Sequence, residues 1–168
     1  NDVITGSSAD DVIIGGTGID VLKGGAGNDV LRGDAGNDFL AGGIGDDNYQ
    51  FGRQHGADTL VEFLDQGTDR VSFLNDIAAD QLWFKQTGND LDVSIIGTDD
   101  HLKVRDWYSA DGPTVESFAT ADGAILYDNQ VQQLVDAMAA FAPPASGESS
   151  LSDDYKTQLD PVIAASWG

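Results

Sequence analysis

The first 50 residues repeat with a period of nine. Residues 15–50 divide into four nonapeptides, GGTGIDVLK, GGAGNDVLR, GDAGNDFLA and GGIGDDNYQ, and a weaker copy, GSSADDVII, precedes them at residues 6–14. The sixth position is always an aspartate, and the eighth is apolar or aromatic. The aspartates are Asp2, Asp11, Asp20, Asp29, Asp38 and Asp47. A period this short indicates units that bury their apolar residue only by stacking on their neighbours.

Each position of the repeat has a physical role. Glycine adopts positive φ, so the first six residues can form a tight turn whose carbonyls point inward. A three-residue strand follows, and its central apolar side chain points to a core. Two repeats then form one coil, and successive coils stack into a parallel β-roll. The opening NDVIT supplies the last five positions of a further repeat, so we expect the chain to be the C-terminal end of a longer protein.

The turns predict a site for a hard cation. Calcium takes six to eight oxygen ligands in flexible geometry, whereas magnesium requires a stricter octahedron. The repeats contain no sulfur or histidine, which disfavours zinc and copper. The predicted carbonyl ligands belong to Gly15, Gly16, Thr17, Gly18, Gly24, Gly25, Ala26, Gly27, Gly33, Asp34, Ala35, Gly36, Gly42, Gly43, Ile44 and Gly45.

Turns that stack on one side of a roll are two repeats apart. The paired aspartates are then Asp2 with Asp20, Asp20 with Asp38, Asp11 with Asp29, and Asp29 with Asp47. This pairing predicts four complete calcium sites. The alternative is a flexible linker rich in glycine and aspartate, but the strict spacing argues against it. Two departures stand out: Ser7, Ser8 and Ala9 should loosen the first turn, and Asp34 should be tolerated because only its carbonyl is needed.

The pattern degrades after residue 50. Gly56-Ala57-Asp58-Thr59-Leu60 and Gly67-Thr68-Asp69-Arg70-Val71 keep half of the motif, and Asp80 follows Asp69 after another eleven residues. We expect larger coils that cap the roll. Asp58 and Asp69 are candidates for additional metal ligands; the alternative is that they are solvated turn residues.

The rest of the chain predicts a different structure. Residues 81–127 alternate in the manner of antiparallel strands, with Trp83, Phe84, Trp107 and Tyr108 in the core. Apolar residues at helical spacing predict an amphipathic helix over residues 128–141. The expected fold is therefore mainly all-β: a parallel β-roll (1–50), a capping region with antiparallel β-structure (51–127), one helix (128–141), and a linker with a flexible tail (142–168), where Pro161 limits helix formation.

Composition restricts the partners. The chain has 29 acidic and 8 basic residues, a formal net charge of −21, so nucleic acid is not expected as a partner. Cations are favoured, although such charge also serves solubility alone. There is no cysteine, and no apolar run approaches the roughly 18 residues of a membrane span.

The repeats resemble the RTX nonapeptide GGxGxDxUx, which is associated with calcium. The segments ADQLWF, GNDLDVSIIGTDD and VRDWY resemble the region after the last repeat block of the family's adenylate cyclase toxin and of related RTX proteins. This resemblance, over roughly residues 6–127, implies a secreted or cell-surface protein, an uncleaved C-terminal signal for a type I exporter, and folding that depends on calcium. We expect the isolated chain to be a monomer.

Two other classes of function were weighed. For an enzyme, no HExxH, GxSxG or P-loop pattern is present, and His55 and His101 lie far apart in the sequence, so we expect no catalytic activity from this chain; a parent enzyme could lie upstream. For an adhesin or surface-layer binding module, exposure of Trp107, Tyr108 or Trp167 would be favourable, and their burial would favour a plain cap.

Overall fold

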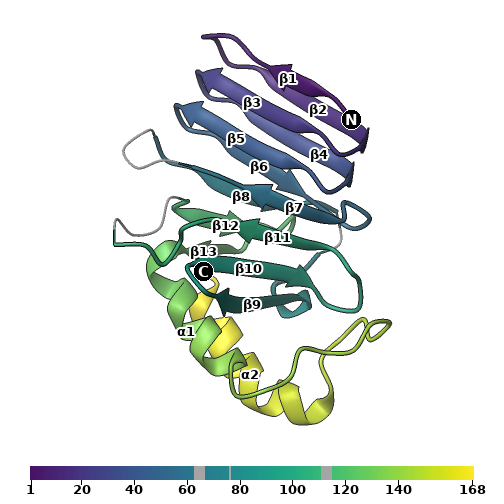
Figure 1. Ribbon diagram of the computed structural model, residues 1–168. Helices are drawn as coiled ribbons and strands as arrows, with labels where there is room; N and C mark the ends of the chain where they lie inside the picture. Colours follow the sequence, from purple (N-terminus) through teal and green to yellow (C-terminus); the bar gives the residue numbers. More distant parts are fainter. Residues whose placement is uncertain (63–66, 76, 111–114) are drawn as a thin grey trace.

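The computed structural model describes residues 1–62, 67–75, 77–110 and 115–168, and its body is a two-sided roll of parallel strands (Figure 1). The roll strands are β1 (Val3–Thr5), β2 (Val12–Gly18), β3 (Val21–Ala26), β4 (Val30–Gly36), β5 (Phe39–Ile44), β6 (Asn48–Phe51), β7 (Ala57–Leu60) and β8 (Arg70–Phe73). One sheet has the order β1-β3-β5-β7-β11-β10-β9, and the other β13-β12-β8-β6-β4-β2. Alternate strands therefore belong to opposite sheets, as the predicted coil requires.

The register of the roll is two repeats. Val21 pairs with Phe39 in one sheet, and Val30 pairs with Asn48 in the other. The apolar residues at the eighth position point inward, where Leu22, Leu31 and Tyr49 are fully buried. The strands are longer than the predicted three residues, because stacked turns also pair: Gly16 lies opposite Asp34 in the ladder.

The larger coils predicted after residue 50 are present at Asp58 and Asp69. Strand β7 pairs with β5 and strand β8 with β6, so both sheets continue past the nonapeptides. The predicted boundary at residue 50 between the roll and the capping region therefore remains a prediction. No comparable coil forms at Asp80, which lies in a short 3-10 helix (η1, Ala79–Gln81) that leads into an antiparallel strand.

Antiparallel structure closes the roll, as predicted. Strands β9 (Leu82–Thr87), β10 (Asp90–Ile95) and β11 (His101–Val104) form a meander, and β11 pairs in parallel with β7. Strands β12 (Ser117–Ala119) and β13 (Ile125–Tyr127) extend the other sheet from β8. The buried Phe118 ring packs against Phe73, Phe84 and Trp107, which gives the cap an aromatic core.

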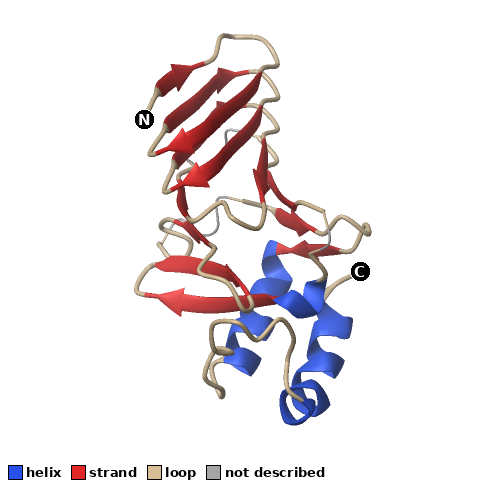
Figure 2. Ribbon diagram, turned by 90° about the vertical axis from the view of Figure 1, so that its right-hand side faces the viewer, coloured by secondary structure: helices blue, strands red, loops and turns tan. Residues whose placement is uncertain are grey.

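Two helices cover this end of the molecule (Figure 2). Helix α1 (Asp128–Met138) begins where predicted but ends three residues before the predicted 141. The prediction of a flexible tail is wrong, because α2 (Asp153–Ser166) packs against α1 and buries Leu159 and Ile163. These residues lie one turn apart on the face toward the core, and their burial offsets the hydrogen bond that Pro161 removes from the helix.

The C-terminus is also anchored. Gly168 exchanges two backbone hydrogen bonds with Ile125, at 2.8 and 2.9 Å, and the Trp167 ring packs edge-on against Phe84. Within the part of the chain that the structure describes, no helix is both long and apolar enough to span a bilayer.

Candidate metal centre

The sixth-position aspartates form two columns along the edges of the roll, which we call ladder 1 and ladder 2. Ladder 1 contains Asp2, Asp20, Asp38 and Asp58, and ladder 2 contains Asp11, Asp29, Asp47, Asp69 and Glu116. Within a ladder, the backbone N–H of each residue donates to one carboxylate oxygen of the next residue. The distance is 2.8 Å from the Asp20 amide to Asp38 Oδ1 and 2.7 Å from the Asp29 amide to Asp47 Oδ1. The four predicted aspartate pairs are therefore neighbours.

The second carboxylate oxygen is buried and has no hydrogen-bond partner at five ladder positions. These are Oδ2 of Asp20, Asp29, Asp38, Asp47 and Asp58, whose side chains are at most 2% exposed. A buried carboxylate oxygen without a partner is costly, because no water or donor replaces its hydration. A bound cation would remove that cost.

Backbone carbonyls surround these oxygens. A β-carbon at Gly15 would lie 2.7 Å from Asp20 Oδ2 and 2.8 Å from the carbonyl oxygen of Gly33, so only glycine leaves this space open. The carbonyl of Gly18 points the other way, against Gly36 of the next stacked turn. The space between two stacked turns is thus lined by oxygen atoms from both.

Among the described residues, no group of three or more His, Asp or Glu side chains lies close enough to hold a metal ion. Backbone carbonyls of the turns supply further oxygen atoms in the same space. A pair of carboxylates with several carbonyls suits calcium, which accepts many oxygens at variable geometry. The residues present therefore fit the ion that the sequence predicts.

The turn backbone explains two of the sequence departures. Asp34 has φ of 63°, a conformation that aspartate tolerates, and its carboxylate lies 2.7 Å from Arg32 Nε. In the first repeat, Asp11 Oδ2 accepts hydrogen bonds from the amide and hydroxyl of Ser7, at 2.6 and 2.9 Å. The first turn therefore satisfies with serine an oxygen that the later turns leave unpaired.

Burial makes the ladders electrostatically strained. It raises the pKa of Asp29, Asp38 and Asp47 above the ordinary value, and the neighbouring ladder carboxylates raise it further. The pKa of Asp58 and of Asp69 rises to about 7 for the same reasons. Stacked carboxylates at neutral pH thus oppose folding when no cation is present.

Glu116 is a member of ladder 2 that the sequence reasoning missed. Its Oε2 accepts a hydrogen bond of 2.5 Å from the Asp69 amide, as the aspartates do for their own neighbours. A signal was present, since the acid in Val115-Glu116-Ser117-Phe118 precedes a buried apolar residue by two positions. Glutamate in place of aspartate and the 47-residue interval hid it.

Ladder 1 ends differently. Leu102 lies opposite Asp58 in the sheet, and Asp100 instead accepts hydrogen bonds from the amides of Gln54 and Gly56, at 2.9 and 2.8 Å. His55 is buried, which lowers its pKa, and its Nε2 lies 3.8 Å from Asp34 Oδ1. These residues hold the larger coil 52–58 against the cap.

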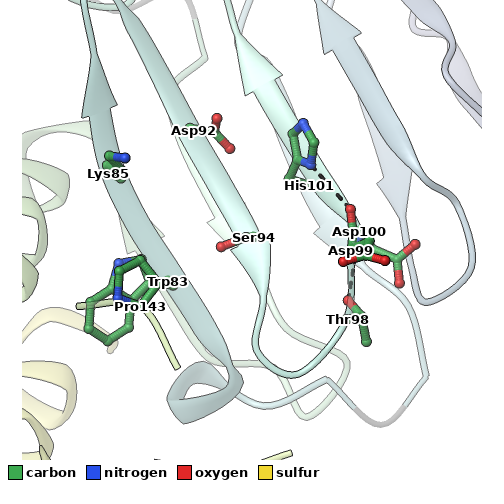
Figure 3. A pocket seen from close by; sticks show the side chains of 9 residues that line it. All are labelled: Trp83, Lys85, Asp92, Ser94, Thr98, Asp99, Asp100, His101 and Pro143. Carbon is green, nitrogen blue, oxygen red and sulfur yellow. Dashed lines mark hydrogen bonds between the residues drawn. The ribbon is translucent and has the colours of Figure 1, made fainter. Parts of the chain in front are cut away.

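A shallow pocket of about 390 Å³ opens on the outer face of β9, β10 and β11 (Figure 3). Its walls include Trp83, His101 and Pro143. Trp83 is almost fully buried and its ring packs against Tyr155, while His101 Nδ1 lies 3.2 Å from the Asp99 carbonyl. The aromatic ring here therefore has a structural partner.

Two family models match this chain. The RTX calcium-binding nonapeptide repeat matches residues 1–22 and 14–49, which contain both ladders as far as Asp47. The haemolysin-type calcium binding protein related domain matches residues 90–130 in the cap. The chain belongs to the RTX family. RTX nonapeptide repeats bind calcium and are typical of secreted or surface bacterial proteins, so the predicted cofactor is confirmed at the level of the family. The finer likeness of this RTX chain to the adenylate cyclase toxin stays a prediction.

One solved structure is similar to part of the RTX chain. It is a subunit of the mannuronan C5-epimerase from Azotobacter vinelandii, determined in solution, with 23% identity and a TM-score of 0.26 over 64% of this chain and 77% of that one.

Proposed function

We propose that this chain is the calcium-binding C-terminal module of a larger secreted bacterial protein, such as a toxin, adhesin or exoenzyme, and that calcium folds it after type I export. The observation that carries the proposal is the set of buried, unpartnered Oδ2 atoms in the ladders. Each is an anionic ligand that the folded protein alone does not satisfy.

The sites proposed are the spaces between stacked turns. Their ligands are the aspartates of the four predicted pairs and the turn carbonyls from Gly15 to Gly18, Gly24 to Gly27, Gly33 to Gly36 and Gly42 to Gly45. Asp58 and Asp69 continue the same ladders and are proposed as ligands of additional ions.

Calcium binds the stacked form and not the extended chain, so its binding energy becomes folding energy. At a calcium concentration ten times Kd, each site adds about 1.4 kcal/mol, and four sites add roughly 5 to 6 kcal/mol. That sum is comparable to the whole stability of a small domain, about 5 to 15 kcal/mol. Sites with Kd of about 10⁻⁴ to 10⁻³ M, as in extracellular modules, would leave the chain unfolded in a low-calcium cytosol.

The cap has a supporting role in this proposal. The strand β8 of the roll packs on the aromatic core of the cap, where the ring of Phe73 stacks on that of Phe118. The burial of Trp107 and Trp167 favours a plain cap over an adhesin-type binding face. We propose a non-catalytic and monomeric module, whose parent protein carries any enzymatic activity.

The secretion part of the proposal is tested by export. The chain is fused to an unrelated slow-folding passenger in a strain that has a type I exporter, and the passenger is assayed in the medium. Removing residues 142–168 should abolish export. The variant Asp20→Asn/Asp29→Asn, which keeps the tail, should still leave the cell. Undiminished export without the tail would contradict the proposed signal.

A further inference from the structure

The last nonapeptide turn differs from the turns before it. The carbonyl oxygen of Gly33 is among the atoms nearest to Gly15, and that of Gly42 is among those nearest to Gly24. In each case the carbonyl belongs to the next stacked turn. At Gly42, the Tyr49 hydroxyl is among the nearest atoms, and it accepts a hydrogen bond of 2.5 Å from the Gly42 amide. A side-chain hydroxyl therefore lies beside Gly42 in this turn.

A second carboxylate enters the same space. The Gly42 amide also donates to Glu62 Oε1, at 2.8 Å, and the Glu62 side chain is only 5% exposed. The unpartnered Asp47 Oδ2 lies directly against Gly42, with its side chain 2% exposed. Two buried carboxylates from different coils thus converge on one glycine.

This arrangement is particular to ladder 2. On ladder 1 the coil that follows the repeats, residues 52–57, contains no acidic residue of its own, and both oxygens of Asp100 accept hydrogen bonds from the amides of Gln54 and Gly56. On ladder 2 the carboxylate of Asp69 lies one step further, where its Oδ1 accepts a hydrogen bond of 2.8 Å from the Asp47 amide. At the junction of roll and cap, the carboxylates of Asp47, Glu62 and Asp69 therefore come from neighbouring positions of ladder 2.

We propose that Glu62 and Asp47 are ligands of a calcium ion at the junction of the roll and the cap, beyond the four sites of the repeats. The inference rests on the proposed calcium-driven folding and extends it. Calcium affinity rises with the number of charged ligands and the rigidity of the site. The repeat sites also pair two carboxylates, but this site is in addition attached to the packed cap and is therefore more rigid, so it fills first. Folding of the roll then proceeds from the cap toward the N-terminus.

The test uses the full chain and counts bound calcium by elemental analysis after equilibrium dialysis, with circular dichroism in parallel. Glu62→Gln keeps the size of the side chain and an oxygen to accept the Gly42 N–H, but removes the charge. The variant should bind one ion fewer than the wild type, and its folding midpoint should shift to severalfold higher calcium. The control Glu148→Gln, at an exposed position, should change neither quantity.

The outcomes separate this inference from the proposed function. A wild-type chain that folds with calcium but binds four ions or fewer would overturn the junction site, together with the additional ions at Asp58 and Asp69, and would leave calcium-driven folding through the four repeat sites intact. This count overturns the junction site even if Glu62→Gln does not fold. An unchanged ion count in a folded Glu62→Gln variant would overturn it as well. A wild-type chain that ignores calcium would instead overturn the proposed function.

Discussion

The double replacement Asp20→Asn/Asp29→Asn is expected to abolish calcium-induced folding at millimolar calcium. Asp20 belongs to two of the proposed sites on ladder 1, and Asp29 belongs to two on ladder 2. The variant therefore removes one carboxylate from all four. Asparagine oxygen still accepts the ladder hydrogen bond, so the loss falls on cation binding. The stabilisation at stake is roughly 5 to 6 kcal/mol at ten times Kd.

Circular dichroism during a calcium titration measures this effect. The matched control is Asp136→Asn/Asp160→Asn, which changes the net charge equally at two exposed helix positions. The control should keep the wild-type calcium midpoint. A double ladder variant that folds at the wild-type midpoint would show that these carboxylates are not ligands.

Lowering the pH is expected to induce part of the β-structure that calcium induces. Burial, and then the neighbouring carboxylates, raise the pKa of Asp58 and Asp69 from 3.8 to about 7 in the metal-free fold. Because the carboxyl pKa is higher in the folded state, the chain takes up protons when it folds at a pH between the unfolded and folded pKa values. The loss of folding stability caused by these charged carboxylates is absent below the unfolded pKa and complete above the folded pKa. Metal-free β-structure should therefore increase as the pH falls through about 7 toward 4.

The free-energy cost of folding with both carboxylates charged is on the order of 4 kcal/mol for each group, because each pKa rises from 3.8 to about 7. The measurement is circular dichroism of metal-stripped protein across this pH window. The variant Asp58→Asn/Asp69→Asn should lose most of the dependence, since neither side chain then titrates. With calcium present the trend reverses, because protons compete for the same oxygens. A wild-type chain whose metal-free structure is constant with pH would contradict this account.

The roll was predictable because its turn and core residues recur at a fixed interval in the sequence. Nine-residue spacing assigns every sixth-position aspartate to a turn and every eighth-position residue to the core, so the pairing of Asp20 with Asp38 follows from counting. The glycines needed for close approach, such as Gly15, also stand at fixed positions. Asp58 and Asp69 do not follow the nine-residue interval, and they were predicted because half of the motif remains in these larger coils.

The C-terminal helix and the additional acidic residues of the ladders depend on contacts between segments far apart in the sequence, which no local pattern predicts. The burial of Leu159 and Ile163 against the cap outweighs the cost of Pro161, and only the packed structure reveals it. Glu116 and Glu62 come from segments without nonapeptide spacing, and they reach ladder 2 through the way the chain folds back. Asp100 likewise closes ladder 1 from a turn between two antiparallel strands.

The central claim is that the two carboxylate ladders stack only when a divalent cation neutralises them. A calcium titration of the metal-stripped wild-type chain, followed by far-ultraviolet circular dichroism with magnesium as the comparison ion, tests it most directly. We predict little β-structure without metal, a cooperative gain over micromolar to millimolar calcium, and no equivalent gain with magnesium. A metal-stripped chain at neutral pH that already has its full β-structure would contradict the account.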